Sequence, residues 1–177
     1  MKVILITGTP GVGKSTVSVI FTKRLDALLI DINKLVGDEG LYIGYDRRTE
    51  TKIVDLDVLC NRIDNIIQNV NKIVIIEGHL SHYFENADLV IVLRTHPEIL
   101  RKRLEHKGFS DDKIRENIEA EAIGVCSYEA FKIHGKRTNE IDTSNISPEE
   151  VANRIIEIIR GKKKFPVGKV DFLEWFC

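Results

Sequence analysis

The sequence predicts an α/β fold in which a parallel β-sheet lies between two layers of helices. Short, nearly continuous apolar runs recur along the chain, a pattern typical of strands buried on both faces. The stretches between them carry apolar residues three and four positions apart, which is typical of helices packed on a sheet. The 177 residues, 43% hydrophobic and 30% charged, suit one domain with a sizeable core.

The predicted strands are short and the predicted helices lie between them. Val3–Thr7, Ile73–Glu77 and Leu89–Leu93 are the strongest strand candidates, and Leu28–Ile30 is a weaker one. The helices are marked by apolar stripes or capping residues: Leu59, Ile63, Ile66, Ile67 and Val70; residues 97–107 with Pro97 in the first turn; Ile114, Ile118, Ala122 and Val125 after Ser110; and a capping box from Ser147 to Glu150 followed by Val151, Ile155, Ile158 and Ile159.

Two segments depart from this alternation. Residues 31–54 are polar and punctuated by glycine, which predicts a small mobile excursion between elements. Residues 162–177 form a tail that is first basic and then aromatic, with Phe165, Phe172, Trp175 and Phe176. The tail either binds a partner or folds back over an apolar groove, with Asp171 starting a short helical turn. We favour the second alternative because clustered exposed aromatic residues are costly.

The stretch GTPGVGKS at residues 8–15 matches the phosphate-binding pattern G-x-x-x-x-G-K-[ST]. A predicted strand runs into it and a predicted helix runs out of it, which is the context that this motif requires. Backbone N–H groups of such a loop surround phosphate oxygens, and the dipole of the following helix favours their negative charge. Lys14 is expected to reach the β- and γ-phosphates, and the Ser15 hydroxyl to bind Mg²⁺. The sequence therefore predicts a three-layer P-loop NTPase fold that binds ATP and Mg²⁺.

Composition narrows the class of function. The net charge is −1, which gives no strong signal for direct nucleic-acid binding. Cys60, Cys126 and Cys177 lie far apart, which disfavours a zinc site or a disulfide framework and favours a reducing, cytoplasmic compartment. We expect Cys60 and Cys126 to be buried structural thiols within helices. No apolar stretch approaches the ~18 residues that a membrane span needs.

The P-loop alone leaves several functions open. The N-K-x-D motif that gives small GTPases their guanine specificity is absent from the sequence. By analogy of fold, a P-loop chain of this length is most often a phosphotransferase with a small acceptor. Such enzymes exclude water with mobile lids that bring cations to the transferred phosphoryl group. Arg103 and Lys107 share a helix face just before a break at residues 108–110, and Arg115 lies beyond it. We expect Arg103 and Lys107 to be lid cations rather than part of a solvated helix face.

The chain resembles the adenylate kinase isoenzyme 6 family, which comprises nucleoside monophosphate (NMP) kinases that also act as ribosome-assembly ATPases. The resemblance runs through most of residues 1–160. It rests on GTPGVGKST at the P-loop, LYIGYD (41–46), an acid-x-His sequence after the third strand, VLRT (92–95), RLEHKG (103–108) and KIRENIEAE (113–121).

Several roles are implied by this resemblance. Residues 31–54 correspond to the NMP-binding flap, residues 106–116 to the lid, and Arg103 to a lid-hinge arginine. Lys107 has the place of a family arginine; it keeps the charge but loses the planar fork of a guanidinium group. The implied triphosphate-binding residues are Gly11, Val12, Gly13, Lys14, Ser15 and Thr16.

The sequence departs from ordinary adenylate kinases after the strand that ends at Glu77. The family's Asp-x-His is here Glu77-Gly78-His79, and Leu80-Ser81 replaces a Pro-Arg pair whose arginine grips the monophosphate. We expect Glu77 to reach Mg²⁺ through a water molecule. His79 could activate water, hold the acceptor phosphate or satisfy loop backbone groups. We favour function for His79 because ligands bind at the carboxyl ends of parallel strands.

Other residues must then grip the monophosphate. Arg47, Arg48 and Arg94 are the candidates, and His82 is expected to be a surface or loop residue without a functional role.

The predicted activity is reversible transfer of the ATP γ-phosphate to AMP or another NMP, with Lys14, Glu77, His79 and Arg103 in the catalytic site. The resemblance also implies ATPase activity in small-subunit rRNA maturation, with a small-subunit platform ribosomal protein and the pre-ribosomal particle as partners. The alternative is an ATP-switched ribosome-assembly factor with little NMP kinase activity.

Overall fold

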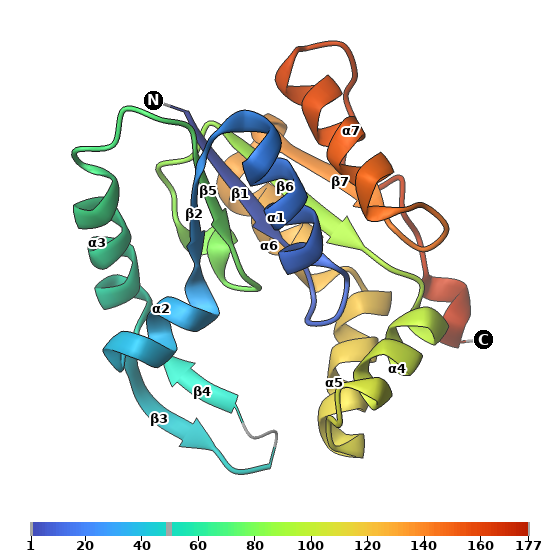
Figure 1. The fold of residues 1–177 in the computed structure, drawn as a ribbon. Helices are drawn as coiled ribbons and strands as arrows, with labels where there is room; N and C mark the ends of the chain where they lie inside the picture. Colours follow the sequence, from blue (N-terminus) through green and yellow to red (C-terminus); the bar gives the residue numbers. More distant parts are fainter. Residues whose placement is uncertain (1, 49–50, 177) are drawn as a thin grey trace.

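A five-stranded parallel sheet forms the centre of the computed structural model, which describes residues 2–48 and 51–176. The strands lie in the order β2 (Leu28–Asp31), β5 (Val74–Glu77), β1 (Val3–Thr7), β6 (Leu89–Arg94) and β7 (Thr138–Asp142) (Figure 1). In this order, β5 and β2 lie on one side of β1, and β6 and β7 lie on the other side. The chain passes from β1 to β2 and later returns past β1 to β6. Ligands bind at such a switch point in open α/β sheets, so the end of β1 is the expected place for a site.

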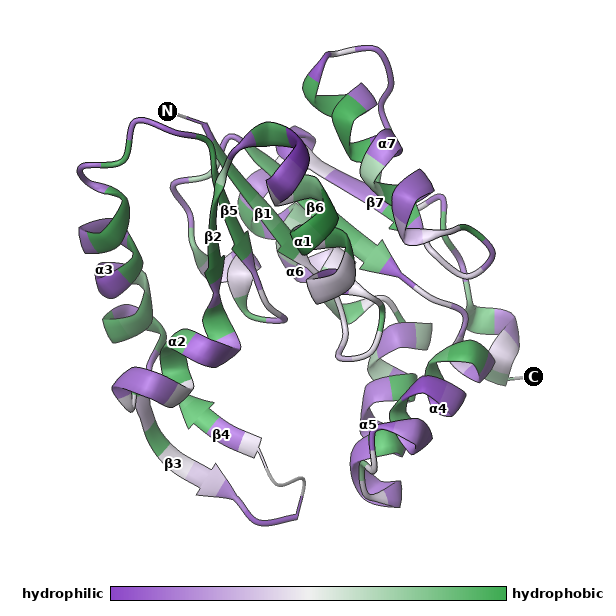
Figure 2. Ribbon diagram, in the orientation of Figure 1, coloured by the Kyte–Doolittle hydropathy of each residue, from purple (hydrophilic) through white to green (hydrophobic). Residues whose placement is uncertain are grey.

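Both faces of the sheet are covered, which confirms the predicted three-layer α/β class. Along β1, Ile4 and Ile6 pack into one core cluster, while Val3 and Leu5 pack into the other. The first cluster includes residues of α1 (Lys14–Leu25), α4 (Pro97–His106), α5 (Asp111–Ala122) and α7 (Pro148–Ile159); the second includes residues of α2 (Ile32–Glu39), α3 (Leu56–Ile67) and α6 (Val125–His134). Figure 2 shows the hydrophobic colouring concentrated in the central strands.

Strand β7 was missed because its sequence, TNEID, is polar. Its residues 138–141 are nevertheless buried. Their polar groups have partners: the Thr138 hydroxyl donates to the Ala130 carbonyl, and the Asn139 side chain accepts from the Phe165 amide. A buried strand can therefore be polar where neighbouring elements satisfy its side chains.

The helix predicted after Ser110 is divided in two. Its stripe was expected to continue to Val125, but α5 ends at Ala122 and α6 begins at Val125. Gly124 between them has a left-handed φ of 70°, which glycine adopts without a steric penalty. Elsewhere Pro97 and the capping box of Ser147 and Glu150 mark helix starts as predicted.

Residues 31–54, predicted as a small excursion between elements, contain a helix and a hairpin. Helix α2 leads into an antiparallel hairpin of β3 (Tyr42–Asp46) and β4 (Thr51–Val54); residues 49 and 50 lie outside the described part of the chain. The hairpin projects from the sheet towards the side where β1 ends (Figure 1). Its exposed apolar side chains are those of Tyr42, Ile43, Tyr45 and Ile53.

The C-terminal tail folds back on the domain, as favoured from the sequence. Phe172 is buried, and Phe165 and Trp175 pack against the first core cluster. The Phe165 carbonyl accepts from the Glu140 amide of β7, and Asp171 accepts from the Leu173 amide at a short 3₁₀ turn, Leu173–Phe176. The tail thus covers the β7 edge, which would otherwise present unpaired backbone groups.

The described cysteines differ in part from expectation. Cys60 and Cys126 do lie in helices, but both are free thiols that are partly rather than fully buried. Cys177 lies outside the described residues.

Candidate active site

The P-loop leaves the end of β1 and enters α1 at Lys14. Gly8 has a φ of 132°, and a Cβ atom there would lie 2.3 Å from the Leu93 carbonyl oxygen. Only glycine allows the loop to leave the strand so close to β6. Gly13 caps α1 with a left-handed φ of 104°, which directs free amide groups of the first helical turn towards the loop.

Lys14 is buried among backbone carbonyls. Its Nζ donates to the carbonyl oxygens of Gly8 at 2.7 Å and Thr9 at 3.0 Å. Burial lowers the pKa of Lys14 to about 8, against the opposing effect of nearby acidic groups that include Glu77. A phosphate group would supply the negative charge that this desolvated ammonium group lacks.

Ser15 and Glu77 meet at the carboxyl ends of β1 and β5. The Ser15 hydroxyl donates to Glu77 Oε1 at 2.9 Å. Among the described residues, buried Glu77 Oε2 has no hydrogen-bond partner. Burial raises the pKa of Glu77, although the Ser15 hydrogen bond opposes this. A hydroxyl group beside a carboxylate with an unsatisfied oxygen fits Mg²⁺, which takes oxygen ligands and retains water.

A cavity of about 690 Å³ lies over the P-loop, within the usual range for ligand sites. All six predicted triphosphate-binding residues, Gly11 to Thr16, line it. Arg103 and Lys107 contribute to the wall from α4 and its C-cap, and Arg103 Nη1 lies 3.4 Å from the Gly11 carbonyl oxygen. Ile99, Phe109, Ile146 and Val151 supply apolar surface. We call this space the donor cavity.

A second cavity of about 790 Å³ lies between the hairpin, α2, the turn after β5 and helices α5 and α6. Pro10, Asn33 and Phe109 line both cavities, so the two spaces adjoin at the P-loop. We call the second space the acceptor cavity. His79 lines it, and burial, with help from the Lys14 charge, lowers the pKa of His79 to about 4. The unliganded site therefore holds His79 neutral.

The expectation for His82 was wrong in part: its place in a turn is as expected, but it is buried rather than at the surface. His82 lies in the 3₁₀ turn Ser81–Tyr83 and is only 1% exposed. Its Nδ1 is 2.8 Å from the Thr7 hydroxyl, and its Nε2 is 3.1 Å from Glu129 Oε2. Nothing in the residue spacing indicated this contact, because Thr7 and Glu129 are distant in sequence. These two contacts of His82 fix the turn that carries His79, on one side to β1 and on the other to α6.

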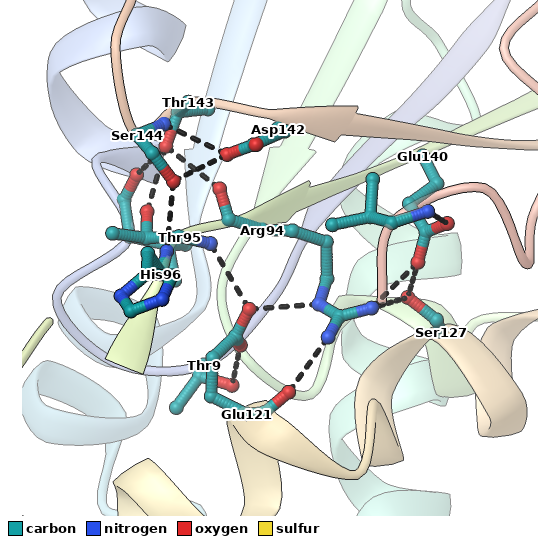
Figure 3. Close-up of polar contacts among 12 residues, drawn as sticks. Thr9, Arg94, Thr95, His96, Glu121, Ser127, Glu140, Asp142, Thr143 and Ser144 are labelled. Carbon is teal, nitrogen blue, oxygen red and sulfur yellow. Dashed lines mark hydrogen bonds and ion pairs between the residues drawn. The ribbon is translucent and has the colours of Figure 1, made fainter. Parts of the chain in front are cut away.

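The hypothesis that Arg94 grips a monophosphate is also wrong. Arg94 is 2% exposed, and its guanidinium donates to Glu121 Oε1 at 2.7 Å and to Glu140 Oε1 at 2.6 Å (Figure 3). Burial alone would lower the pKa of Arg94, but the two carboxylates raise it. Breaking such a buried pair would leave an uncompensated charge, so Arg94 is a structural cation.

Arg48 is better placed near the acceptor. It lies at the end of the hairpin, and its Nη2 is 3.7 Å from Glu116 Oε2 on α5, a residue that lines the acceptor cavity. Both side chains are more than half exposed. Arg47 is exposed at the same turn. Among the described residues that line the acceptor cavity, the Lys and Arg side chains are those of Lys52 and Lys113.

Sequence reasoning missed several residues around the P-loop. The Thr143 hydroxyl donates to the Val12 carbonyl at 3.1 Å, and the Thr9 hydroxyl donates to Glu121 Oε2 at 2.5 Å. Thr143, which follows β7, lies in no recognised motif; Glu121 ends the KIRENIEAE stretch, but that stretch gave no role to this residue. Asn33, which lines both cavities, lies in the flap that was identified only as a segment.

Comparison with known proteins places these features in context. A family model described as AAA domain matches residues 4–124. A curated protein of Methanothermobacter thermautotrophicus named "Putative adenylate kinase" is 43% identical over 172 residues, covering 97% of this chain and 98% of that protein. One with the same name from Methanocaldococcus jannaschii is 42% identical over 171 residues, covering 97% and 93%.

Solved structures share the fold at low identity. Shikimate kinase from Acinetobacter baumannii in complex with shikimate has a TM-score of 0.66 at 15% identity, covering 92% of this chain and 95% of that one. Thymidylate kinase from Candida albicans has a TM-score of 0.56 at 16% identity, covering 90% and 91%. Within the described residues, no helix has the length and apolar character needed to cross a membrane.

Proposed function

Because the chain belongs to the family of the archaeal proteins named "Putative adenylate kinase", we propose that it is an NMP kinase with ATPase activity. It transfers the γ-phosphate of ATP reversibly to AMP or another NMP. The observation that carries this proposal is the pair of cavities that adjoin at the P-loop, one beside Lys14 and one beside His79. Two adjoining sites are what direct transfer between two nucleotides requires.

In the proposed reaction, an oxygen of the acceptor phosphate forms a bond to the γ-phosphorus as the bond to the β,γ-bridging oxygen breaks. ADP and a nucleoside diphosphate result, and no proton need be removed from an ionised acceptor. Lys14 stabilises the negative charge on the transferred group. Ser15 and Glu77 would hold Mg²⁺, which neutralises phosphate charge. Arg103 and Lys107 add positive charge from the lid side of the donor cavity.

Two alternative catalytic roles of His79 can be separated experimentally. Attack by water, unlike attack by a phosphate oxygen, releases a proton, and neutral His79 can accept it. Bound phosphate anions would raise the pKa of His79 from about 4 towards the range useful for a base. Alternatively, an imidazole N–H can donate to the acceptor phosphate.

The second candidate function is an ATP-switched ribosome-assembly factor. The turn after β5 favours it, because Ser81 is fully buried there and donates to the Ile6 carbonyl at 3.1 Å. That turn offers no arginine to the acceptor, which disfavours efficient AMP phosphorylation. By the family resemblance, ATP hydrolysis would then control binding to a small-subunit ribosomal protein during rRNA maturation.

A coupled assay of ADP formation tests the choice. We expect addition of AMP or another monophosphate from a panel of four to stimulate ADP formation strongly, with the matching nucleoside diphosphate as the second product. Hydrolysis that ignores every monophosphate but responds to a small-subunit ribosomal protein would instead support the switch.

A further inference from the structure

Glu121 lines neither cavity, yet it contacts the P-loop and the end of β6 together. It is 1% exposed; its Oε2 accepts from the Thr9 hydroxyl at 2.5 Å, and its Oε1 accepts from the Thr95 amide at 3.0 Å (Figure 3). We propose that Glu121 is a positioning residue for phosphoryl transfer, holding the P-loop and the lid helix α5 to one point. This inference rests on the proposed function, because it takes the P-loop as the donor-nucleotide site.

The contact with Thr9 reaches the nucleotide site in one further step. The Thr9 carbonyl oxygen accepts from Lys14 Nζ at 3.0 Å. Glu121 therefore fixes Thr9 through its hydroxyl, and Thr9 in turn positions Lys14 through its carbonyl. A hydrogen bond to a buried carboxylate is charge-assisted and stronger than a neutral one. If Thr9 were released, Lys14 and the loop amides could shift, and a displacement of 1 Å can cost about 100-fold in rate.

The same residue anchors α5. Arg94 Nη2 donates to the Glu121 backbone carbonyl at 2.6 Å, while Arg94 Nε donates to its side chain. The other end of α5 carries Lys113 and Glu116, which line the acceptor cavity. The C-terminal end of the lid helix is therefore fixed to the P-loop, and any lid closure has to turn about this end.

Glu140 provides a matched control. It also pairs with Arg94 and is buried, but its other partners are the Ser127 hydroxyl and the tail amides of Gly168 and Val170. Among the described residues, it forms no hydrogen bond or ion pair with the P-loop. Glu121→Gln and Glu140→Gln each preserve side-chain size and remove one negative charge beside Arg94.

The two variants separate positioning from stability. We expect similar losses of thermal midpoint, but kcat for phosphoryl transfer should fall about 10- to 100-fold in Glu121→Gln and stay within about two-fold of wild type in Glu140→Gln. Equal kinetics in the two variants at equal stability would overturn the proposal.

Thr9→Val removes the hydroxyl that donates to Glu121 and leaves the ion pairs of Arg94 intact. It should slow transfer like Glu121→Gln, and the double variant should be no slower than the slower single variant, since both changes weaken the same hydrogen bond between Thr9 and Glu121. Additive losses, or wild-type rates in Thr9→Val, would contradict the proposal. Ser127→Ala removes the corresponding hydroxyl from Glu140 and should leave kcat unchanged; this pair also decides the matter if Glu121→Gln does not fold.

A failure of the proposed function would be recognised separately. If the wild-type protein transfers no phosphate to any monophosphate, the affinity for a fluorescent ATP analogue becomes the readout. We then expect about 10-fold weaker binding in Glu121→Gln and unchanged binding in Glu140→Gln. Equal affinities would overturn the role of Glu121 itself.

Discussion

The donor and acceptor halves of the site are built differently. Around the P-loop, the polar side chains of Thr9, Lys14 and Glu121 are buried and hydrogen-bonded. Around the acceptor cavity, the Arg48–Glu116 pair is exposed and Tyr45 is 54% exposed. Buried charge-assisted contacts fix geometry, whereas exposed pairs contribute ~0–1 kcal/mol. The P-loop side is therefore held by buried contacts, whereas the hairpin side of the acceptor cavity depends on exposed ones.

Replacing the buried lysine of the donor half should have the largest effect. Lys14→Met removes the charge that we propose to stabilise the transferred phosphoryl group, and we expect kcat to fall about 10²- to 10³-fold. Circular dichroism and the thermal midpoint check that the variant folds. A loss of kcat below about 10-fold would contradict the role proposed for Lys14 in the donor half.

Removing the tail tests how much the tail contributes to the stability of the fold. Deletion of residues 165–177 exposes the β7 edge, removes the buried Phe172 side chain and takes two amide donors from Glu140. We expect a loss of about 3 kcal/mol, or about 10²-fold in the folding equilibrium, and a midpoint lower by about 10 °C. An unchanged midpoint with lost binding to a partner would favour the recognition alternative.

His79 lines the acceptor cavity. We expect His79→Ala to lower ATP hydrolysis by at least about 10-fold. Because the pKa of His79 is about 4 in the free protein, the pH profile of kcat/KM of the wild type should show no inflection near pH 6.5 beyond that of the nucleotide phosphates, which His79→Ala shares. Loss of hydrolysis with intact transfer assigns His79 to water, and loss of both assigns it to the acceptor phosphate. Normal hydrolysis with normal nucleotide affinity contradicts a catalytic role.

The affinity for ATP should depend on pH through Lys14. Its pKa is about 8 in the free protein, and bound phosphates raise it. Above pH 8 the free protein has lost this proton and must take it up again on binding, so affinity falls as pH rises. The expected loss approaches about 10-fold for each pH unit, measured by titration calorimetry between pH 7 and 10. Lys14→Met should show no such slope over this range.

The smallest effect is expected at the hairpin. Arg48→Ala should raise the KM for the monophosphate by a few-fold and change stability by less than about 0.5 kcal/mol, with the affinity for ATP unchanged. Arg62→Ala is the control, because Arg62 forms a partly exposed pair with Glu39 and neither residue lines a cavity. An unaltered KM in Arg48→Ala would remove Arg48 from the acceptor site.

Local patterns in the sequence predicted the donor half better than the acceptor half. The P-loop lies within eight consecutive residues, and β1, β5 and β6 are apolar enough to identify. The contact between Thr9 and Glu121 joins residues 112 positions apart, so no local pattern contains it. Arg94 resembled a substrate ligand because its charge is visible in the sequence, whereas the carboxylates that neutralise it come from two other elements. Strand β7 was missed because its polar residues are satisfied by tertiary contacts.

The break between α5 and α6 restricts which residues the chain can accept there. A Cβ atom at Gly124 would lie 3.2 Å from Arg94 Nη1, and its backbone is left-handed. Gly40 is also left-handed, with φ 68° and ψ 32°, but a Cβ atom there would meet no atom within 4 Å. In a saturation mutagenesis library, asparagine, which tolerates this backbone region, should survive at position 40 and be depleted at position 124. The interior cation thus sets the substitution tolerance of a loop position that carries no side chain.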